Sequence, residues 1–123
     1  MIRMSRADFE RVVESALDEL PEVFARQLDN LAVVIEDEPD PDDLAEMGLD
    51  PEKDGDELFG LYSGVPLIDR GASYSGLPDR VLIYRGPLLR ACTSRRELVS
   101  EIKKTVIHEI GHHFGLDEHE MPY

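Results

Sequence analysis

The sequence is poor in cysteine and lacks long apolar runs. Its 123 residues include a single cysteine, Cys92, and no tryptophan. One cysteine cannot form a disulfide within the chain, whereas small secreted domains commonly depend on several. No apolar run approaches the roughly 18 residues that a membrane-spanning helix needs. The first residues, MIRMSRADFERVVESAL, lack the apolar core of a signal peptide. We therefore expect a protein of the reducing cytoplasm.

Positive charge is also scarce. Thirteen Lys and Arg stand against 27 Asp and Glu, which gives a formal net charge of -14. Such a molecule repels phosphate backbones and anionic lipid headgroups. We therefore expect neither nucleic acid nor a membrane as a partner.

Most of the negative charge lies in one segment, residues 36–57, which holds twelve acidic residues and one basic one. The segment also contains prolines and glycines, a composition that favours a solvated loop. Its acids do not follow the spacing of an EF-hand, so we predict no calcium site. Two roles stay open: a loop that confers solubility, or a lid or selector for basic substrates.

A mass of 13.9 kDa fits one domain over residues 1–123. Apolar spacing predicts helices over residues 5–20, 21–30 and 94–115, and β-branched runs predict strands over residues 31–35, 58–62 and 81–84. The segment 71–76, GASYSG, is expected to be a surface loop. This mixed order of helices and strands predicts an α+β domain.

The last predicted helix carries the motif HExxH as His108-Glu109-Ile110-Gly111-His112. Two histidines four residues apart differ by only about 40° around a helix, so both project from one face. This arrangement suits a single zinc ion, and Glu109 is placed to take a proton from a bound water without ligating the metal.

The same helix has an apolar stripe on its other side. Val99, Ile102, Val106 and Ile110 recur at helical spacing and lie nearly opposite the two motif histidines. One face is therefore predicted to pack in the core and the other to form a site. His113 falls on the apolar side, and we assign it no metal role.

A catalytic zinc with two histidine ligands needs a third protein ligand and one open position. Gly115 allows the chain to leave the helix and fold back toward the metal. The candidates that follow it are Asp117, Glu118 and His119.

The run HEIGHHFGLDE resembles the metzincin-like motif HExxHxxGxxH/D, in which the last position is the third zinc ligand. More broadly, the segments LFGLYSGVPL, VLIYRGPLLRAC and RELVSEIKKTVIHEIGHHFGL are similar to the small bacterial zincin-like metallopeptidase family. The resemblance covers about half of the chain, and the substrates of that family are unidentified.

The resemblance implies a minimal zincin-like metallopeptidase fold, with a small mixed sheet packed on helices and Zn²⁺ bound on the C-terminal helix. It makes His108 and His112 metal ligands, Glu109 the catalytic base and Glu118 the third ligand. Metzincins use His or Asp at this last position, so Glu118 departs from the pattern by one methylene group.

The expected function is hydrolysis of peptide bonds in a peptide or protein substrate. Zinc would lower the pKa of a bound water toward about 7, and Glu109 would accept the proton. Candidates for stabilising the oxyanion are Tyr84, Arg85, Tyr123 and the metal. We expect the peptide to add as a strand beside residues 81–84.

Two other functions stay open at this stage. A zinc-bearing, non-catalytic binding or regulatory module would share the metal ligands but show no turnover. A helical interaction domain would bind no metal at all. The sequence does not indicate an oligomeric state.

Overall fold

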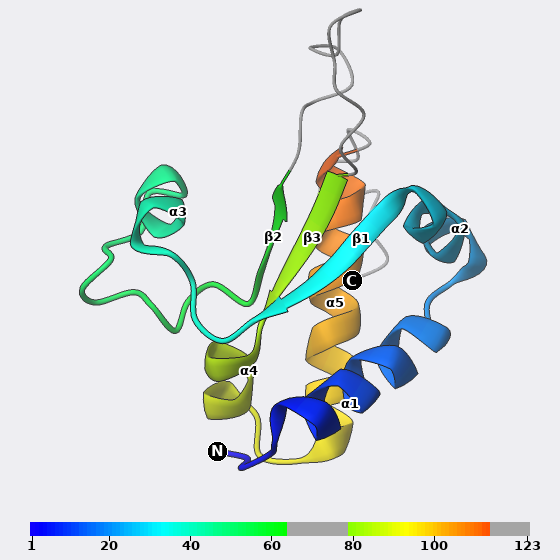
Figure 1. The fold of residues 1–123 in the computed structure, drawn as a ribbon, viewed down its shortest axis with the longest axis horizontal. Helices are drawn as coiled ribbons and strands as arrows, with labels where there is room; N and C mark the ends of the chain where they lie inside the picture. Colours follow the sequence, from blue (N-terminus) through cyan, green and yellow to red (C-terminus); the bar gives the residue numbers. More distant parts are fainter. Residues whose placement is uncertain (64–78, 114–123) are drawn as a thin grey trace, which may run out of the picture.

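A computed structural model describes residues 1–63 and 79–113, apart from the side chains of Asp29, Asn30, His112 and His113. The predicted loop at residues 71–76 and the predicted helix end near Gly115 lie outside this part of the chain. The elements are, in order, α1 (Arg6–Asp18), α2 (Glu22–Ala25), the 3₁₀ helix η1 (Arg26–Asn30), β1 (Leu31–Glu36), α3 (Pro41–Glu46), β2 (Gly60–Ser63), β3 (Asp79–Tyr84), α4 (Arg85–Ala91) and α5 (Arg95–His113). The expected α+β class is confirmed (Figure 1).

The strands form a small mixed sheet in the order β1-β3-β2. β1 pairs with β3 in parallel, with Val34 opposite Leu82, and β2 pairs with β3 antiparallel, with Leu61 opposite Leu82. β3 is therefore the central strand of the described sheet. Our expectation that residues 81–84 form an exposed edge was wrong, because β2 and β1 lie on either side of β3.

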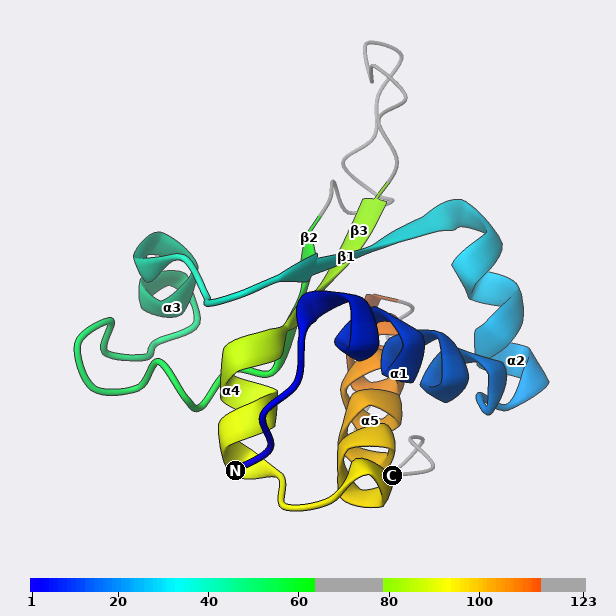
Figure 2. The same cartoon turned by 60° about the horizontal axis from the view of Figure 1, so that its bottom comes forward.

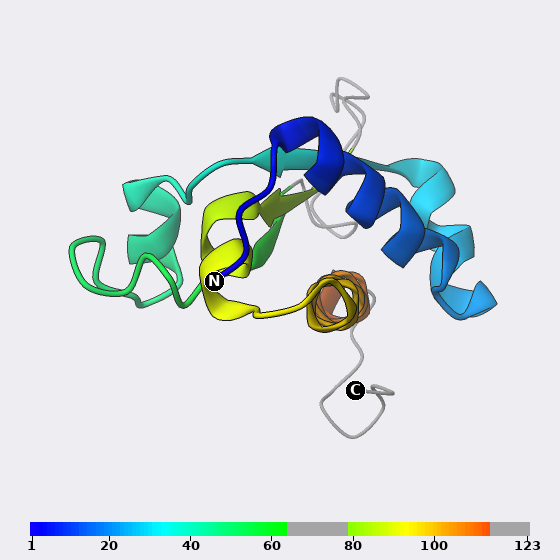
Figure 3. The same cartoon turned by 90° about the horizontal axis from the view of Figure 1, so that it is seen from below.

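The two faces of β3 belong to different clusters. Val81 and Ile83 are buried in the main core with the helices, whereas Leu82 and Tyr84 pack with Leu44 on the other face. The alternation follows from the two-residue period of a strand. Figure 2 shows α1 crossing α5 on the helical side of the sheet, and Figure 3 shows α5 end-on between α1 and α4.

Serine side chains cap the first turns of the two long helices, α1 and α5. The Ser5 hydroxyl accepts from the amide of Asp8 at 3.1 Å, and the Ser94 hydroxyl accepts from the amide of Glu97 at 3.1 Å. The Glu97 carboxylate in turn accepts from the amide of Thr93 at 3.1 Å. These bonds satisfy amides that the first turns of α1 and α5 leave without helical partners.

The acidic segment is not wholly a loop, which corrects our expectation. Asp40 accepts a hydrogen bond from the amide of Asp42 at 2.8 Å and so caps α3, whose first residue is Pro41. Leu44 anchors the short helix, because its side chain is only 2% exposed. A cap, a proline in the first turn and one buried leucine outweigh the loop-favouring composition around them.

Helix α4 was also missed. Gly86 and Pro87 lie in the first turn of this seven-residue helix, whose Leu88 is fully buried. Proline is tolerated there because the first-turn amides have no helical acceptor. In the part of the chain that the structure describes, no helix is long and apolar enough to cross a membrane.

Candidate metal centre

The HExxH motif lies on α5, as its spacing predicted. His108 and His112 are four residues apart within the helix, so their Cα atoms are one turn apart on the same side. His108 is half-buried, while the side chain of His112 lies outside the described part. The backbone thus provides the spacing that a histidine pair needs to share a metal.

The core-facing side of α5 confirms the predicted stripe. Ile102, Val106 and Ile110 are at most 1% exposed, whereas His108 and Glu109 are half-buried. The buried stripe fixes the rotation of the helix. It therefore holds the side chains of His108 and Glu109 at the boundary between core and solvent, where a ligand can reach them.

Glu109 is held by the neighbouring edge of the sheet. The backbone amide of Tyr62 in β2 donates a hydrogen bond to Oε2 of Glu109 at 3.3 Å. The amide of Tyr84 donates to the carbonyl of Phe59 at 2.9 Å, so the backbone carbonyl of Phe59 points toward β3. In an antiparallel pair, successive residues alternate between pointing their backbone groups toward the partner strand and away from it. The backbone groups of Gly60 and Tyr62 therefore point away from β3. Glu109 consequently lies against the outer edge of β2.

Gly60 allows this close approach of strand and helix. A Cβ atom at Gly60 would lie 2.5 Å from Cγ2 of Thr105 on α5 and 2.8 Å from the carbonyl oxygen of Leu82. Both distances are well below van der Waals contact, so only glycine fits between β3 and α5. The separation of β2 from α5, and hence the reach from Tyr62 to Glu109, depends on this residue.

The Tyr62 side chain fixes its own backbone. Its hydroxyl hydrogen-bonds to the carboxylate of Asp79 at the start of β3, and Asp79 is only 5% exposed. β2 is thus tied to β3 through a side-chain contact as well as through the backbone ladder. The Tyr62 amide that donates to Glu109 therefore belongs to a strand whose position is fixed by both kinds of contact.

A cavity of about 240 Å³ opens beside the motif. Its lining residues come from the segment just before β2, from the first residue of β2 and from one side of α5: Leu58, Phe59, Gly60, Lys104, Thr105, His108 and Glu109. Lys104 was not singled out from the sequence, although it lies four residues before His108 and so on the same side of the helix. The cavity combines an apolar wall with one cationic and two motif side chains.

Several predicted site residues lie elsewhere. Tyr84 points to the sheet face away from the main core, and Arg85 donates to Asp37 at 3.0 Å and to the carbonyl of Met4 at 2.9 Å. Neither is positioned to stabilise an oxyanion at Glu109.

The candidates for the third ligand, Asp117, Glu118 and His119, lie outside the described residues, as does Tyr123. Within residues 1–63 and 79–113, no three His, Cys, Asp or Glu side chains gather closely enough to hold a metal ion. The side chain of His112 and residues 114–123 are not among these described groups.

Comparisons with known proteins bear on the same region. Residues 28–123 match the sequence model of a family described as zincin-like metallopeptidase. No curated protein matches the sequence. A solved structure described as "conserved hypothetical protein" from Thermo thermophilus is 28% identical, with 89% of this chain and 94% of that chain covered and a TM-score of 0.57.

Proposed function

The chain belongs to the zincin-like metallopeptidase family, and from this premise we propose that it is a zinc-dependent peptidase. The observation that carries the proposal is the placement of Glu109. Its carboxylate borders a cavity shared with His108 and accepts a hydrogen bond from the outer edge of β2. The carboxylate of Glu109, the imidazole of His108 and the outer edge of β2 thus lie close together.

The residues fit a zinc ion in their donor chemistry. Imidazole nitrogen is a preferred zinc ligand, and paired histidines one helical turn apart are a common way to supply two. We assign His108 and His112 as ligands and Glu118 as the third, with Asp117 and His119 as the alternatives. Bound zinc would supply Lewis-acid chemistry, polarising a peptide carbonyl and making water more acidic.

The chain's own residues carry the proton transfers. Glu109 removes a proton from the attacking water as the water oxygen bonds to the carbonyl carbon. The same carboxyl group then gives the proton to the amine as the carbon–nitrogen bond breaks. The amide of Tyr62 orients the carboxylate for both steps.

The outer edge of β2 is the position we propose for the substrate. Extended peptides commonly bind by adding a strand to an exposed sheet edge. A peptide beside Gly60 and Tyr62 would pass directly next to Glu109, since that carboxylate meets the edge at Tyr62. This proposal replaces β3, which is an interior strand.

The Glu109→Gln substitution tests the function. The amide side chain keeps the shape of the carboxylate but cannot act as a base, so we expect zinc content to be unchanged and cleavage of a diverse peptide library to fall by about 10²–10⁴-fold. Zinc is measured by elemental analysis and cleavage by mass spectrometry on the same preparations.

Glu14→Gln is the matched control, because it removes one charge at an exposed position on α1. It should leave cleavage at the wild-type rate. Equal activity of wild type and Glu109→Gln would contradict the assignment of the base. Zinc bound without any cleavage by the wild type would favour the non-catalytic zinc-binding module instead.

A further inference from the structure

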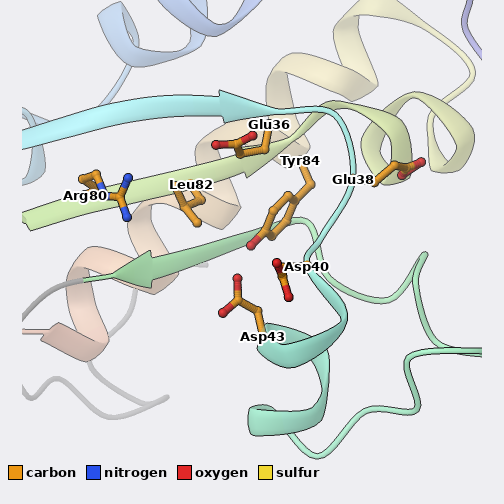
Figure 4. Close-up of a pocket in the computed structure, with 7 residues that line it drawn as sticks. All are labelled: Glu36, Glu38, Asp40, Asp43, Arg80, Leu82 and Tyr84. Atoms are coloured by element: carbon orange, nitrogen blue, oxygen red, sulfur yellow. The ribbon is translucent and has the colours of Figure 1, made fainter.

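A second cavity lies on the sheet face opposite the main core. It has a volume of about 300 Å³ and is lined by Glu36, Glu38, Asp40, Asp43, Arg80, Leu82 and Tyr84 (Figure 4). These residues come from the end of β1, the acidic segment with α3, and β3. Leu82 and Tyr84 belong to the smaller hydrophobic cluster, not to the cluster that holds α5. The cavity therefore lies on the sheet face opposite α5 and shares no lining residue with the cavity at His108 and Glu109.

The carboxylates of this cavity are only partly neutralised. Glu38 forms an ion pair with Arg90 at 2.7 Å, and Asp40 accepts the capping hydrogen bond of α3. Among the described residues, Glu36 and Asp43 form no ion pair. Arg80 precedes Tyr84 by four residues on β3, about 13 Å along the strand, so its charge lies toward the other end of the cavity.

The hydroxyl of Tyr84 is a second, independent feature of the cavity. Tyr84 is 1% exposed, and its hydroxyl has no hydrogen-bond partner among the described residues. Figure 4 shows this hydroxyl directed toward Asp40 and Asp43. A buried hydroxyl without a partner is costly. Its position suggests that a ligand donor supplies the missing hydrogen bond.

The protonation state of this tyrosine is consistent with that role. Burial, together with the carboxylates of Asp43, Glu36 and Asp40, raises the pKa of Tyr84 to about 12. At neutral pH the hydroxyl is therefore uncharged. Its oxygen lone pairs are available to a cationic donor, while the nearby carboxylates provide the compensating negative charge.

We propose that this cavity binds the basic side chain of an arginine or lysine carried by a peptide. The carboxylates of Glu36 and Asp43 pair with the cationic head, and the hydroxyl of Tyr84 accepts one of its hydrogen bonds. Hydrogen bonds between a cationic donor and a carboxylate are stronger than hydrogen bonds between neutral groups.

The size and lining of the cavity favour an organic cation over a bare metal ion. A volume of about 300 Å³ far exceeds the space that one water occupies. Leu82 and the ring of Tyr84 provide apolar surface that suits the methylene stem of a basic side chain. The acidic segment would then recognise a basic group, which is one of the two roles that its composition left open.

The binding of a basic side chain does not depend on peptidase activity, so it is tested with metal-free protein in EDTA. The full chain is titrated with acetyl-Gly-Arg-Gly-amide, and binding is followed by ¹H–¹⁵N NMR. We expect shifts at the amides of Asp43, Leu82 and Tyr84. A peptide with citrulline in place of arginine, which has the same shape without the charge, should produce none.

Variants locate the interaction. Asp43→Asn and Tyr84→Phe should each weaken the arginine peptide about tenfold, with spectra that otherwise remain those of the folded protein. Glu46→Gln removes the same charge from α3 at an exposed position that does not line the cavity. This control should bind as wild type does.

Four results would contradict the inference. The first is equal binding of the citrulline and arginine peptides, and the second is no binding of either peptide. The third is a Glu46→Gln variant whose affinity for the arginine peptide falls as much as that of Asp43→Asn. The fourth is tighter binding of agmatine than of the arginine peptide. The last result would assign the cavity to a free amine. In a parallel titration without EDTA, shifts of the same amides with calcium chloride but not with the arginine peptide would assign it to an inorganic cation.

Discussion

The hydroxyl of Tyr84 ionises among carboxylates, which gives it a testable signature. The chain has four tyrosines, and burial raises the pKa of Tyr84 from 10.0 to about 12. We expect absorbance at 295 nm to show one tyrosine titrating near pH 12, and Tyr84→Phe should remove that phase. A wild-type titration in which all four tyrosines ionise with pKa values near 10 would contradict the buried environment.

The same shift determines how Tyr84 affects stability. The folded pKa of about 12 lies above the ordinary value of 10.0, so the folded state retains its proton where the unfolded state has lost it. The contribution of Tyr84 to the free energy of unfolding is therefore complete below pH 10 and falls as pH rises through 12.

For single residues of the candidate site, the sequence predicted only those features that follow from the type of side chain and its spacing along the chain. The spacing of His108 and Glu109 on one helix was sufficient to single them out. The amide of Tyr62 was not predictable, because a backbone donor has no signature in the sequence and its position depends on strand pairing. Cys92 is fully buried in the main core.

Strand β2 and helix α5 meet at Gly60, and this contact is testable by one added methyl group. Gly60→Ala places a Cβ 2.8 Å from the backbone oxygen of Leu82, which cannot rotate away. We expect the free energy of unfolding to fall by about 1–3 kcal/mol, as measured by urea denaturation.

Gly55→Ala is the matched control for that change. A Cβ at Gly55 meets nothing within 4 Å, so the substitution should leave stability unchanged or raise it by up to about 1 kcal/mol. Equal effects of the two substitutions would mean that β2 does not approach α5 as closely as the structure has it.

Helices and strands were predictable from the sequence where apolar residues recur at regular spacing over several residues. Helices α1 and α5 combine caps with long apolar stripes, and their starts were predicted correctly. The short helices α3 and α4 each have fewer than two turns. The sequence signal was dominated by a proline and acidic residues in α3, and by a glycine and a proline in α4. The order of strands in the sheet depends on contacts between distant residues, and periodicity within β3 does not encode its central position.

At the scale of the whole molecule, the acidic segment is attached to the body. Arg90 on α4 pairs with Glu38 at 2.7 Å and with Asp56 at 2.6 Å, and Arg85 pairs with Asp37 at 3.0 Å. Exposed ion pairs contribute little stability individually. They do connect both ends of the segment to one helix, so its carboxylates occupy a defined position relative to β3.

The central claim is that α5 carries a metal site, and the zinc content of purified variants tests it most directly. Elemental analysis after loading and desalting should find about one zinc ion per chain in the wild type and in His113→Ala, a histidine on the same helix with no assigned metal role. His108→Ala and His112→Ala should lose it. A wild type that retains no zinc, or a His108→Ala protein that retains as much as the wild type, would contradict the account.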